Sequence, residues 1–129
     1  MGGSILVVDD EPGIQAAFDL VLGSTYDLRM ASSVEEALDT SSEAAAAVKV
    51  IFLDGILDGA LTGDRALPLF LRQFPQASII YIGALGSLNA PALHAAGVSM
   101  VLPKPWEVTD IRAIAARGVS MAHRKRSVS

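Results

Sequence analysis

The chain has 129 residues, a formal net charge of −4 at pH 7 and no cysteine. This length suits one domain built on a single hydrophobic core. The acidic balance argues against a nucleic-acid-binding surface, and the absence of cysteine excludes a disulfide framework. Apolar residues make up 51% of the sequence, but their runs are far shorter than the roughly 18 residues of a membrane span. With no signal-peptide pattern at its start, the chain is expected to be a soluble protein of the reducing cytoplasm.

The first half of the chain alternates between strand and helix patterns. Ile5–Val8 is a short apolar run that predicts a strand, and residues 14–22 carry apolar side chains at the spacing of one helix face. Tyr26–Met30 predicts the second strand. The segment Ser33–Glu36 matches a capping box and indicates the start of a second helix. Val48–Leu53 is almost continuously apolar, which is typical of a parallel strand buried on both faces.

The second half of the chain continues this alternation. Its predicted elements are a helix over Ala66–Phe74 ended by Pro75, a strand over Ser78–Ile82, a helix capped by Asn89 that runs through Ala96 and stops at Gly97, a strand over Met100–Leu102 and a helix capped by Thr109. Strand and helix thus alternate five times. Parallel strands joined by such crossovers form a doubly wound α/β sheet, whose functional sites lie at the carboxyl ends of the strands.

Charged residues occupy the ends of three predicted strands. Asp9 and Asp10 follow the first strand, Asp54 follows the third, and Lys104 follows the fifth. Carboxylates at close range repel one another, so such a cluster is favoured when it holds a cation, and an all-oxygen ligand set suits Mg²⁺ or Mn²⁺ better than zinc. Lys104 would neutralise a phosphoryl oxygen that the metal does not reach. These residues predict a phosphate-accepting site.

Three motifs resemble those of one signalling family. They are residues 5–12 (ILVVDDEP), 50–54 (VIFLD) and 102–106 (LPKPW), and in this order they resemble the response-regulator receiver domains of two-component systems, such as the chemotaxis response regulator. The resemblance implies a flavodoxin-like doubly wound five-stranded parallel sheet of strand order 2-1-3-4-5, with five helices. It also implies a receiver domain over 1–121, followed by a basic tail or the start of a linker over 122–129.

The resemblance implies a role for each site residue. Asp54 would be the phosphoacceptor, and Mg²⁺ would be bound by Asp9, Asp10, Asp54 and the backbone carbonyl of Ile56. Lys104 would contact the phosphoryl group, and the peptide bond that follows it is expected to be cis. Such a domain would catalyse its own phosphorylation and slow dephosphorylation without being a conventional turnover enzyme.

The switch region departs from the family pattern. Gly83, followed by Ala84, replaces the usual hydroxyl residue at the end of the fourth strand, and Val101 replaces the usual aromatic residue three positions before the lysine. We therefore expect that the family's usual switch cannot operate in its usual form. Ser87 offers a replacement hydroxyl from the neighbouring loop, a hypothesis that rests only on its nearness in sequence.

For several other residues we favour a structural role over a functional one. Asp58 and Gly59 replace a common proline; they read as a solvent-facing turn, although Asp58 would also add negative charge beside the metal. Trp106 is predicted to pack the start of the last helix against the sheet rather than to bind a partner. His94 and His123 have no partner at metal-ligand spacing, so neither is assigned chemistry.

These residues are compatible with three functions to different degrees. The first is a phosphorylatable receiver that takes its phosphoryl group from a histidine kinase or phosphotransfer protein and signals to an output domain or target protein, with homodimerisation through the fourth and fifth helices left open. The second is a docking or dimerisation module that works without phosphorylation, as Gly83 and Val101 would allow. The third, a stand-alone hydrolase, is disfavoured because Ile56 stands where such phosphatases carry a second acid. No direct contact with nucleic acid or membrane is expected.

Overall fold

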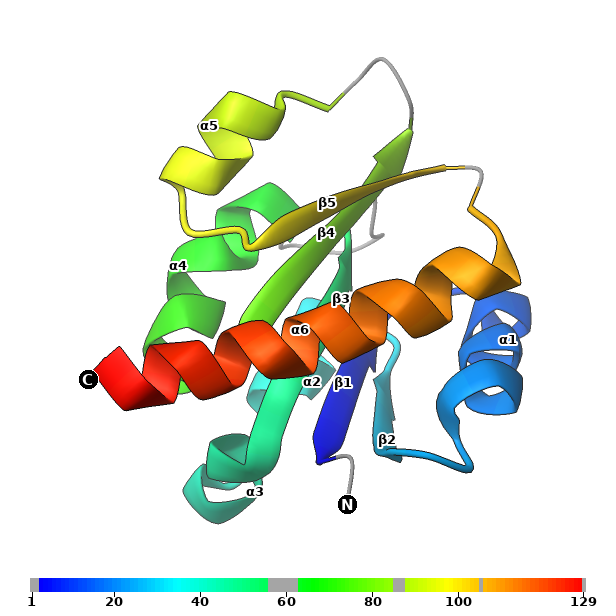
Figure 1. Ribbon diagram of the computed structural model, residues 1–129, viewed down its shortest axis with the longest axis horizontal. Helices are drawn as coiled ribbons and strands as arrows, with labels where there is room; N and C mark the ends of the chain where they lie inside the picture. Colours follow the sequence, from blue (N-terminus) through cyan, green and yellow to red (C-terminus); the bar gives the residue numbers. More distant parts are fainter. Residues whose placement is uncertain (1–2, 56–62, 85–87, 105, 129) are drawn as a thin grey trace.

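The computed structural model describes residues 3–55, 63–84, 88–104 and 106–128 (Figure 1). Five parallel strands form one sheet in the order β2-β1-β3-β4-β5. The strands are β1 (Ser4–Val8), β2 (Asp27–Ala31), β3 (Val48–Asp54), β4 (Ser78–Ala84) and β5 (Met100–Lys104). This order confirms the predicted flavodoxin-like sheet, and all five strands lie where the apolar runs indicated, with bounds shifted by one or two residues.

Helices cover both faces of the sheet. They are α1 (Pro12–Leu22), α2 (Val34–Leu38), α3 (Ser42–Ala47), α4 (Gly63–Gln73), α5 (Ala90–Ala95) and α6 (Val108–Val128). One hydrophobic core joins α1 and α6 to one face of the sheet, and a second core lies on the other face with α2, α3 and α4 (Figure 1). Among the described residues, no helix is long and apolar enough to cross a membrane.

The sequence predicted two helix starts and one helix end correctly. The Ser33 hydroxyl accepts a hydrogen bond from the Glu36 backbone N–H at 3.0 Å, and the Asn89 side chain accepts one from Ala92 N–H at 3.2 Å. Gly97 follows α5 with φ of +107°, a conformation that side chains with a Cβ rarely adopt. Local features of the sequence therefore set the start of α2 and both ends of α5.

The short helix α3 was not predicted, so the described residues form six helices rather than five. Its cap is Ser41, which accepts a hydrogen bond from Ala44 N–H at 3.2 Å, and Ala45 is buried against the core. The signal was a serine followed by a run of alanines, the residue with the best helix propensity. A helix of six residues gains little from propensity alone, and its packing against the sheet decides that it forms.

The start of α6 also differs from the prediction. The helix begins at Val108, so Thr109 lies inside it and is not its cap. Instead, the Asp110 carboxylate accepts a hydrogen bond from Glu107 N–H at 2.9 Å. The helix continues to Val128 through the segment expected to be a tail, and Ala122 is buried.

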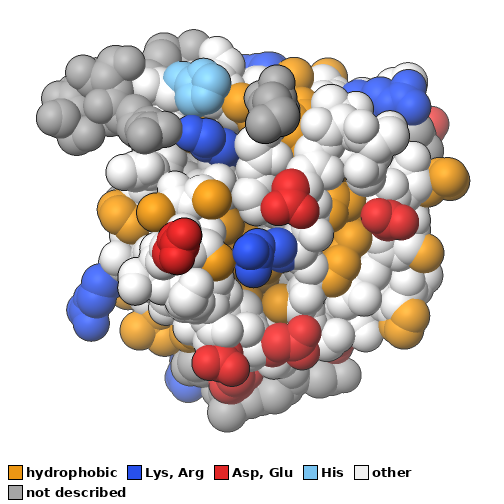
Figure 2. Space-filling model, turned by 90° about the horizontal axis from the view of Figure 1, so that it is seen from below, with side chains coloured by type: hydrophobic (Ala, Val, Ile, Leu, Met, Phe, Trp, Pro, Cys, Tyr) orange, Lys and Arg blue, Asp and Glu red, His pale blue; other side chains and the backbone are white. Residues whose placement is uncertain are grey.

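Charges of both signs are interspersed on the face of the molecule seen from below Figure 1 (Figure 2). Hydrophobic side chains lie between them. This face lies at the amino ends of the strands, where β1 begins (Figure 1). An even mixture of charges is typical of an ordinary solvated surface.

The aromatic contacts of α1 give a test of the core next to the site. Phe18 is fully buried, with its ring centroid 4.8 Å from that of Phe52 and 5.6 Å from that of Trp106, whereas Leu20 on the same helix is 84% exposed. We expect Phe18→Ala to lower the free energy of unfolding by about 3–5 kcal/mol, because it removes a buried ring and leaves a cavity. Leu20→Ala, the matched control, should change it by less than about 0.5 kcal/mol. Urea unfolding followed by circular dichroism measures both, and equal losses would contradict this description of the core.

Candidate functional site

The carboxyl ends of β1, β3 and β5 bring together four of the residues singled out in the sequence. Asp9 and Asp54 are buried, with 2% and 1% exposure, and Asp10 is partly buried. One carboxylate oxygen from each of the three lies within 4.8 Å of the others. Lys104 Nζ lies 3.6 Å from Asp54 Oδ1. The site is therefore an acidic cluster with one ammonium group at its side.

Hydrogen bonds from three elements hold Asp9 in place. Its backbone N–H donates to Ala31 O at 3.0 Å, which extends the pairing of β1 with β2, and its carboxylate accepts a hydrogen bond from Glu11 N–H at 2.9 Å. Gln15 on α1 donates from Nε2 to Asp9 O at 2.7 Å and to Ser32 Oγ at 3.3 Å. The amide of Gln15 thus fastens the first helix to the ends of both strands. Sequence reasoning missed this residue, because nothing in its spacing distinguishes it from other polar residues of the helix.

Burial raises the pKa of Asp9 to about 6, and the nearby negative charges of Asp54 and Glu11 act in the same direction. The hydrogen bond from the Glu11 backbone and the positive charge of Lys104 oppose the shift. Three carboxylates and one ammonium leave a formal excess of two negative charges in the cluster. This excess, together with a donor set made only of oxygen atoms, fits a divalent cation such as Mg²⁺ or Mn²⁺.

A pocket of about 470 Å³ opens next to the cluster, between the start of α1 and the end of β5. It is lined by Glu11, Ile14, Lys104 and Trp106. Trp106 is partly buried and packs on Phe18, so it ties the chain just before α6 to the core beneath α1. The pocket gives a molecule outside the protein an approach to the ammonium group of Lys104.

The switch positions lie on β4 and β5, beside the cluster. Gly83 is buried, and a Cβ atom built on it would lie 2.6 Å from Leu88 Cδ2, so Leu88 fills the space of the missing side chain. Ala84 is exposed and stands in register with Lys104. Val101 is partly buried and stands in register with Tyr81. An aromatic residue is therefore present, but on the strand next to the expected one.

Tyr81 was missed by the sequence reasoning. A signal was available, because a residue two positions before Gly83 in a strand faces the same side of the sheet. The tyrosine is 8% exposed and stands in register with Leu53 on one side and Val101 on the other. All three side chains belong to the same core.

Several predicted features lie outside the described residues and stay predictions. They are the Ile56 carbonyl as a metal ligand, the turn at Asp58 and Gly59, the hydroxyl of Ser87 and the cis bond before Pro105.

The histidines take no part in the cluster. The Nδ1 atom of His94 lies 2.9 Å from Val98 O, which confirms that this histidine is satisfied by a backbone partner. His123 is exposed on α6.

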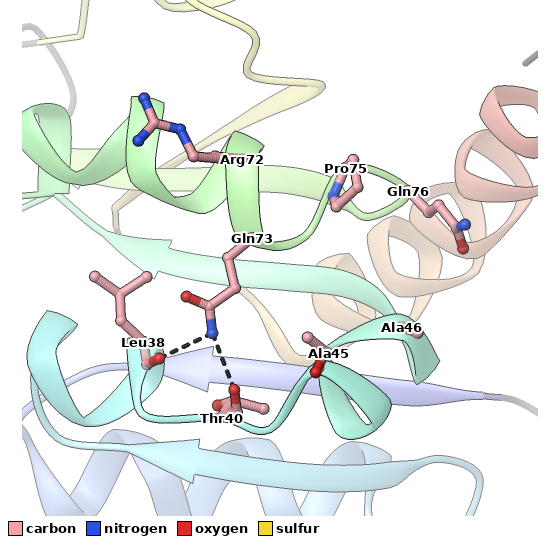
Figure 3. A pocket seen from close by; sticks show the side chains of 9 residues that line it. Leu38, Thr40, Ala45, Ala46, Arg72, Gln73, Pro75 and Gln76 are labelled. Carbon is pink, nitrogen blue, oxygen red and sulfur yellow. Dashed lines mark hydrogen bonds between the residues drawn. The ribbon is translucent and has the colours of Figure 1, made fainter.

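Another pocket lies at the opposite end of the sheet (Figure 3). Its volume is about 550 Å³, and it is formed where α2 and α4 end, close to α3. Gln73 projects from α4 between these elements and donates from Nε2 to Leu38 O at 2.8 Å and to Thr40 O at 3.2 Å. These bonds satisfy the carbonyl group of the last residue of α2 and one just beyond the helix, so the polar groups here have a structural role.

Comparisons with known proteins agree with this geometry. The family model of the response regulator receiver domain matches residues 5–116. No match was found in a search of curated proteins. Among solved structures, the receiver domain of NtrX from Brucella abortus is 29% identical with a TM-score of 0.75, and the match covers 90% of this chain and 98% of that one. A response regulator receiver domain protein from Clostridium thermocellum is 26% identical with a TM-score of 0.82, and 98% of each chain is covered.

A longer NtrX structure from Brucella abortus is 27% identical with a TM-score of 0.86; the match covers 99% of this chain, which spans only 29% of the length of NtrX. Receiver domains generally bind Mg²⁺ at an acidic pocket and interact with histidine kinases and output domains. This chain has an acidic cluster formed by Asp9, Asp10 and Asp54. The fold, the acidic cluster and the family match over most of the sequence lead to one conclusion: the chain belongs to the family of response-regulator receiver domains.

Proposed function

We propose that this receiver accepts a phosphoryl group on Asp54 from a histidine kinase or phosphotransfer protein and signals through protein contacts. The observation that carries the proposal is the position of Lys104, whose ammonium group lies 3.6 Å from the buried Asp54 carboxylate at the edge of the acidic cluster. A buried carboxylate beside one fixed cation is suited to attack phosphorus and to have the added negative charge neutralised.

Asp9, Asp10 and Asp54 would hold Mg²⁺, with the Ile56 carbonyl as a further ligand; when bound, the ion would offset the negative charge of the cluster and of the phosphoryl oxygens. In the transfer, an Asp54 oxygen attacks phosphorus, the new O–P bond forms, and the P–N bond to the donor histidine breaks. Lys104 would stabilise charge on an equatorial oxygen during this step. The donor's imidazole nitrogen keeps the electron pair of the broken bond.

The alternative is a docking or dimerisation module that acts without phosphorylation. Gly83 favours it, because this position has no hydroxyl that could form a hydrogen bond to a phosphoryl group on Asp54. The space that a side chain would occupy here is filled by Leu88. The two functions differ in one property, which is whether Asp54 takes up a phosphoryl group.

Phosphoryl uptake from acetyl phosphate tests this difference. The wild type with Mg²⁺ should gain the mass of one phosphoryl group, as measured by intact-protein mass spectrometry, and Asp54→Asn should gain none. Asp39→Asn, which changes an exposed carboxylate far from the cluster, is the control and should behave as the wild type. Absence of an adduct on a wild-type protein that still binds Mg²⁺ would favour the docking module.

The contribution of Lys104 is measured by its neutral variant. We expect Lys104→Gln to slow uptake from acetyl phosphate by about 10- to 100-fold, since a hydrogen bond to a charged group is worth about 1.5–3 kcal/mol. Lys49→Gln at the start of β3 removes a charge at the other end of the same sheet and should leave the rate unchanged. Equal rates for the two variants would remove Lys104 from the mechanism.

The raised pKa of Asp9 predicts how stability depends on pH. The folded pKa of about 6 lies above the ordinary value of 3.8, so the folded protein binds this proton more tightly than the unfolded chain. The resulting stabilisation is fully present below about pH 4 and is lost as the pH rises through about 6. Asp9→Asn keeps the oxygen that accepts the Glu11 N–H bond and has no charge to bury.

Metal-free Asp9→Asn should therefore be more stable than the wild type by about 1–3 kcal/mol at neutral pH, and the difference should shrink below pH 6. Thermal unfolding in a chelating buffer across this range measures it. The variant should also lose the rise in melting temperature that Mg²⁺ gives the wild type. Asp39→Asn again serves as control, and a variant that is less stable than the wild type at neutral pH would contradict the assignment of a buried, charged Asp9.

A further inference from the structure

The strongest unexplained feature is the position of Tyr81, which none of the roles above uses. Its ring lies in the core beside the acidic cluster, in register with Leu53, the residue just before Asp54. On its other side it is in register with Val101, whose small side chain replaces the expected aromatic. An aromatic ring therefore stands between the strand of the acceptor and the strand of Lys104.

The tyrosine hydroxyl reaches the acceptor end of β3 only because of a glycine. A Cβ atom built on Gly55 would lie 2.5 Å from the Tyr81 hydroxyl oxygen and 2.6 Å from the nearest ring carbons, distances that real Cβ atoms essentially never show. Any other residue at position 55 would force the ring to move. The hydroxyl thus occupies the side-chain space of the residue that directly follows Asp54.

Tyr81 also contributes to a pocket in another part of the fold. Tyr81 lines a pocket of about 360 Å³ together with Leu67 of α4 and Leu88, Ala92 and Leu93 at and within α5. Leu88 is also the side chain that fills the space over Gly83. A displacement of the ring would therefore press on Leu88 and α5 or open the pocket beneath them, since packed side chains have little free volume in which to move.

We propose that Tyr81 is the positioning residue through which the state of Asp54 is transmitted to Leu88 and α5. The inference rests on the proposed phosphorylation of Asp54. The hydroxyl, beside Gly55, would exchange its hydrogen-bond partner when charge is added at Asp54, and the ring would carry this change to the apolar contacts under α5. One residue would thus combine the hydroxyl and the aromatic that Gly83 and Val101 lack.

Hydrogen exchange of residues 88–97 tests the proposal, because this segment contains Leu88 and α5. Exchange is measured by mass spectrometry with Mg²⁺ alone and with beryllofluoride, a stable mimic of the aspartyl phosphate. Four proteins are compared: the wild type, Tyr81→Phe, Tyr26→Phe and Asp54→Asn. Tyr81→Phe removes only the hydroxyl, and Tyr26→Phe is the matched control, since Tyr26 is the other of the chain's two tyrosines and packs on the other core.

Beryllofluoride should change the exchange rates of residues 88–97 by about tenfold in the wild type and in Tyr26→Phe, the size of a typical coupling between two sites. In Tyr81→Phe the change should fall to less than about twofold, while fluorine NMR shows that beryllofluoride still binds. Asp54→Asn should neither bind it nor respond. If Tyr81 had only a packing role, Tyr81→Phe would respond to beryllofluoride as the wild type does, because phenylalanine retains the packed ring.

The inference is overturned if Tyr81→Phe binds beryllofluoride and responds as the wild type does, or if the wild type binds it without any change in residues 88–97. It is also overturned if Tyr81→Phe no longer binds, since the tyrosine would then belong to the phosphoryl site itself. A wild type that fails to bind beryllofluoride would instead contradict the proposed function, and this inference with it. Whether the wild type binds beryllofluoride therefore distinguishes a failure of the proposed function from a failure of the proposed role of Tyr81.

Discussion

Repulsion among three carboxylates is the constraint on which this receiver depends. Asp9, Asp10 and Asp54 are brought close together where β1 and β3 end, and two of them are almost entirely buried. Water cannot screen their charges well there, and the single ammonium of Lys104 offsets only part of them. Burial raises the pKa of Asp9 to about 6, and the negative charge of Asp54 adds to this effect. We expect such a site to gain stability from a bound cation, and under the proposed function an added phosphoryl group would change its charge.

Apolar packing and hydrogen bonds between uncharged groups and the strand ends keep these charges together. The apolar residues of β1 and β3 are buried on both faces of the sheet, so the two strands cannot separate to relieve the repulsion. Gln15 on α1 adds hydrogen bonds to the backbone carbonyl of Asp9 and to the hydroxyl of Ser32. Asp9 itself accepts the Glu11 N–H, which limits its rotation. Core packing thus opposes the electrostatic cost at the edge of the sheet.

The region beside the cluster has an aromatic residue on the strand next to the expected one. The usual positions of a hydroxyl and an aromatic hold Gly83 and Val101, and Tyr81 stands in register between Leu53 of the acceptor strand and Val101. Gly55 leaves room for the hydroxyl of this tyrosine, and Leu88 fills the space over Gly83. The functional consequence of losing a side chain in a packed core can therefore be judged only when the residue that fills its space is known.

The sequence by itself determined the order of strands and helices, because parallel strands buried on both faces leave long apolar runs and capping residues such as Ser33 and Asn89 act within one turn. It also determined which charged residues meet, since the carboxyl ends of parallel strands share one edge of the sheet. Only the tertiary structure decided the remaining features. The short α3 depends on packing of Ala45, the hydrogen bonds of Gln15 depend on where α1 lies, and the place of Tyr81 depends on strand register and on space left by Gly55. These features arise from contacts between residues distant in sequence, which no local pattern records.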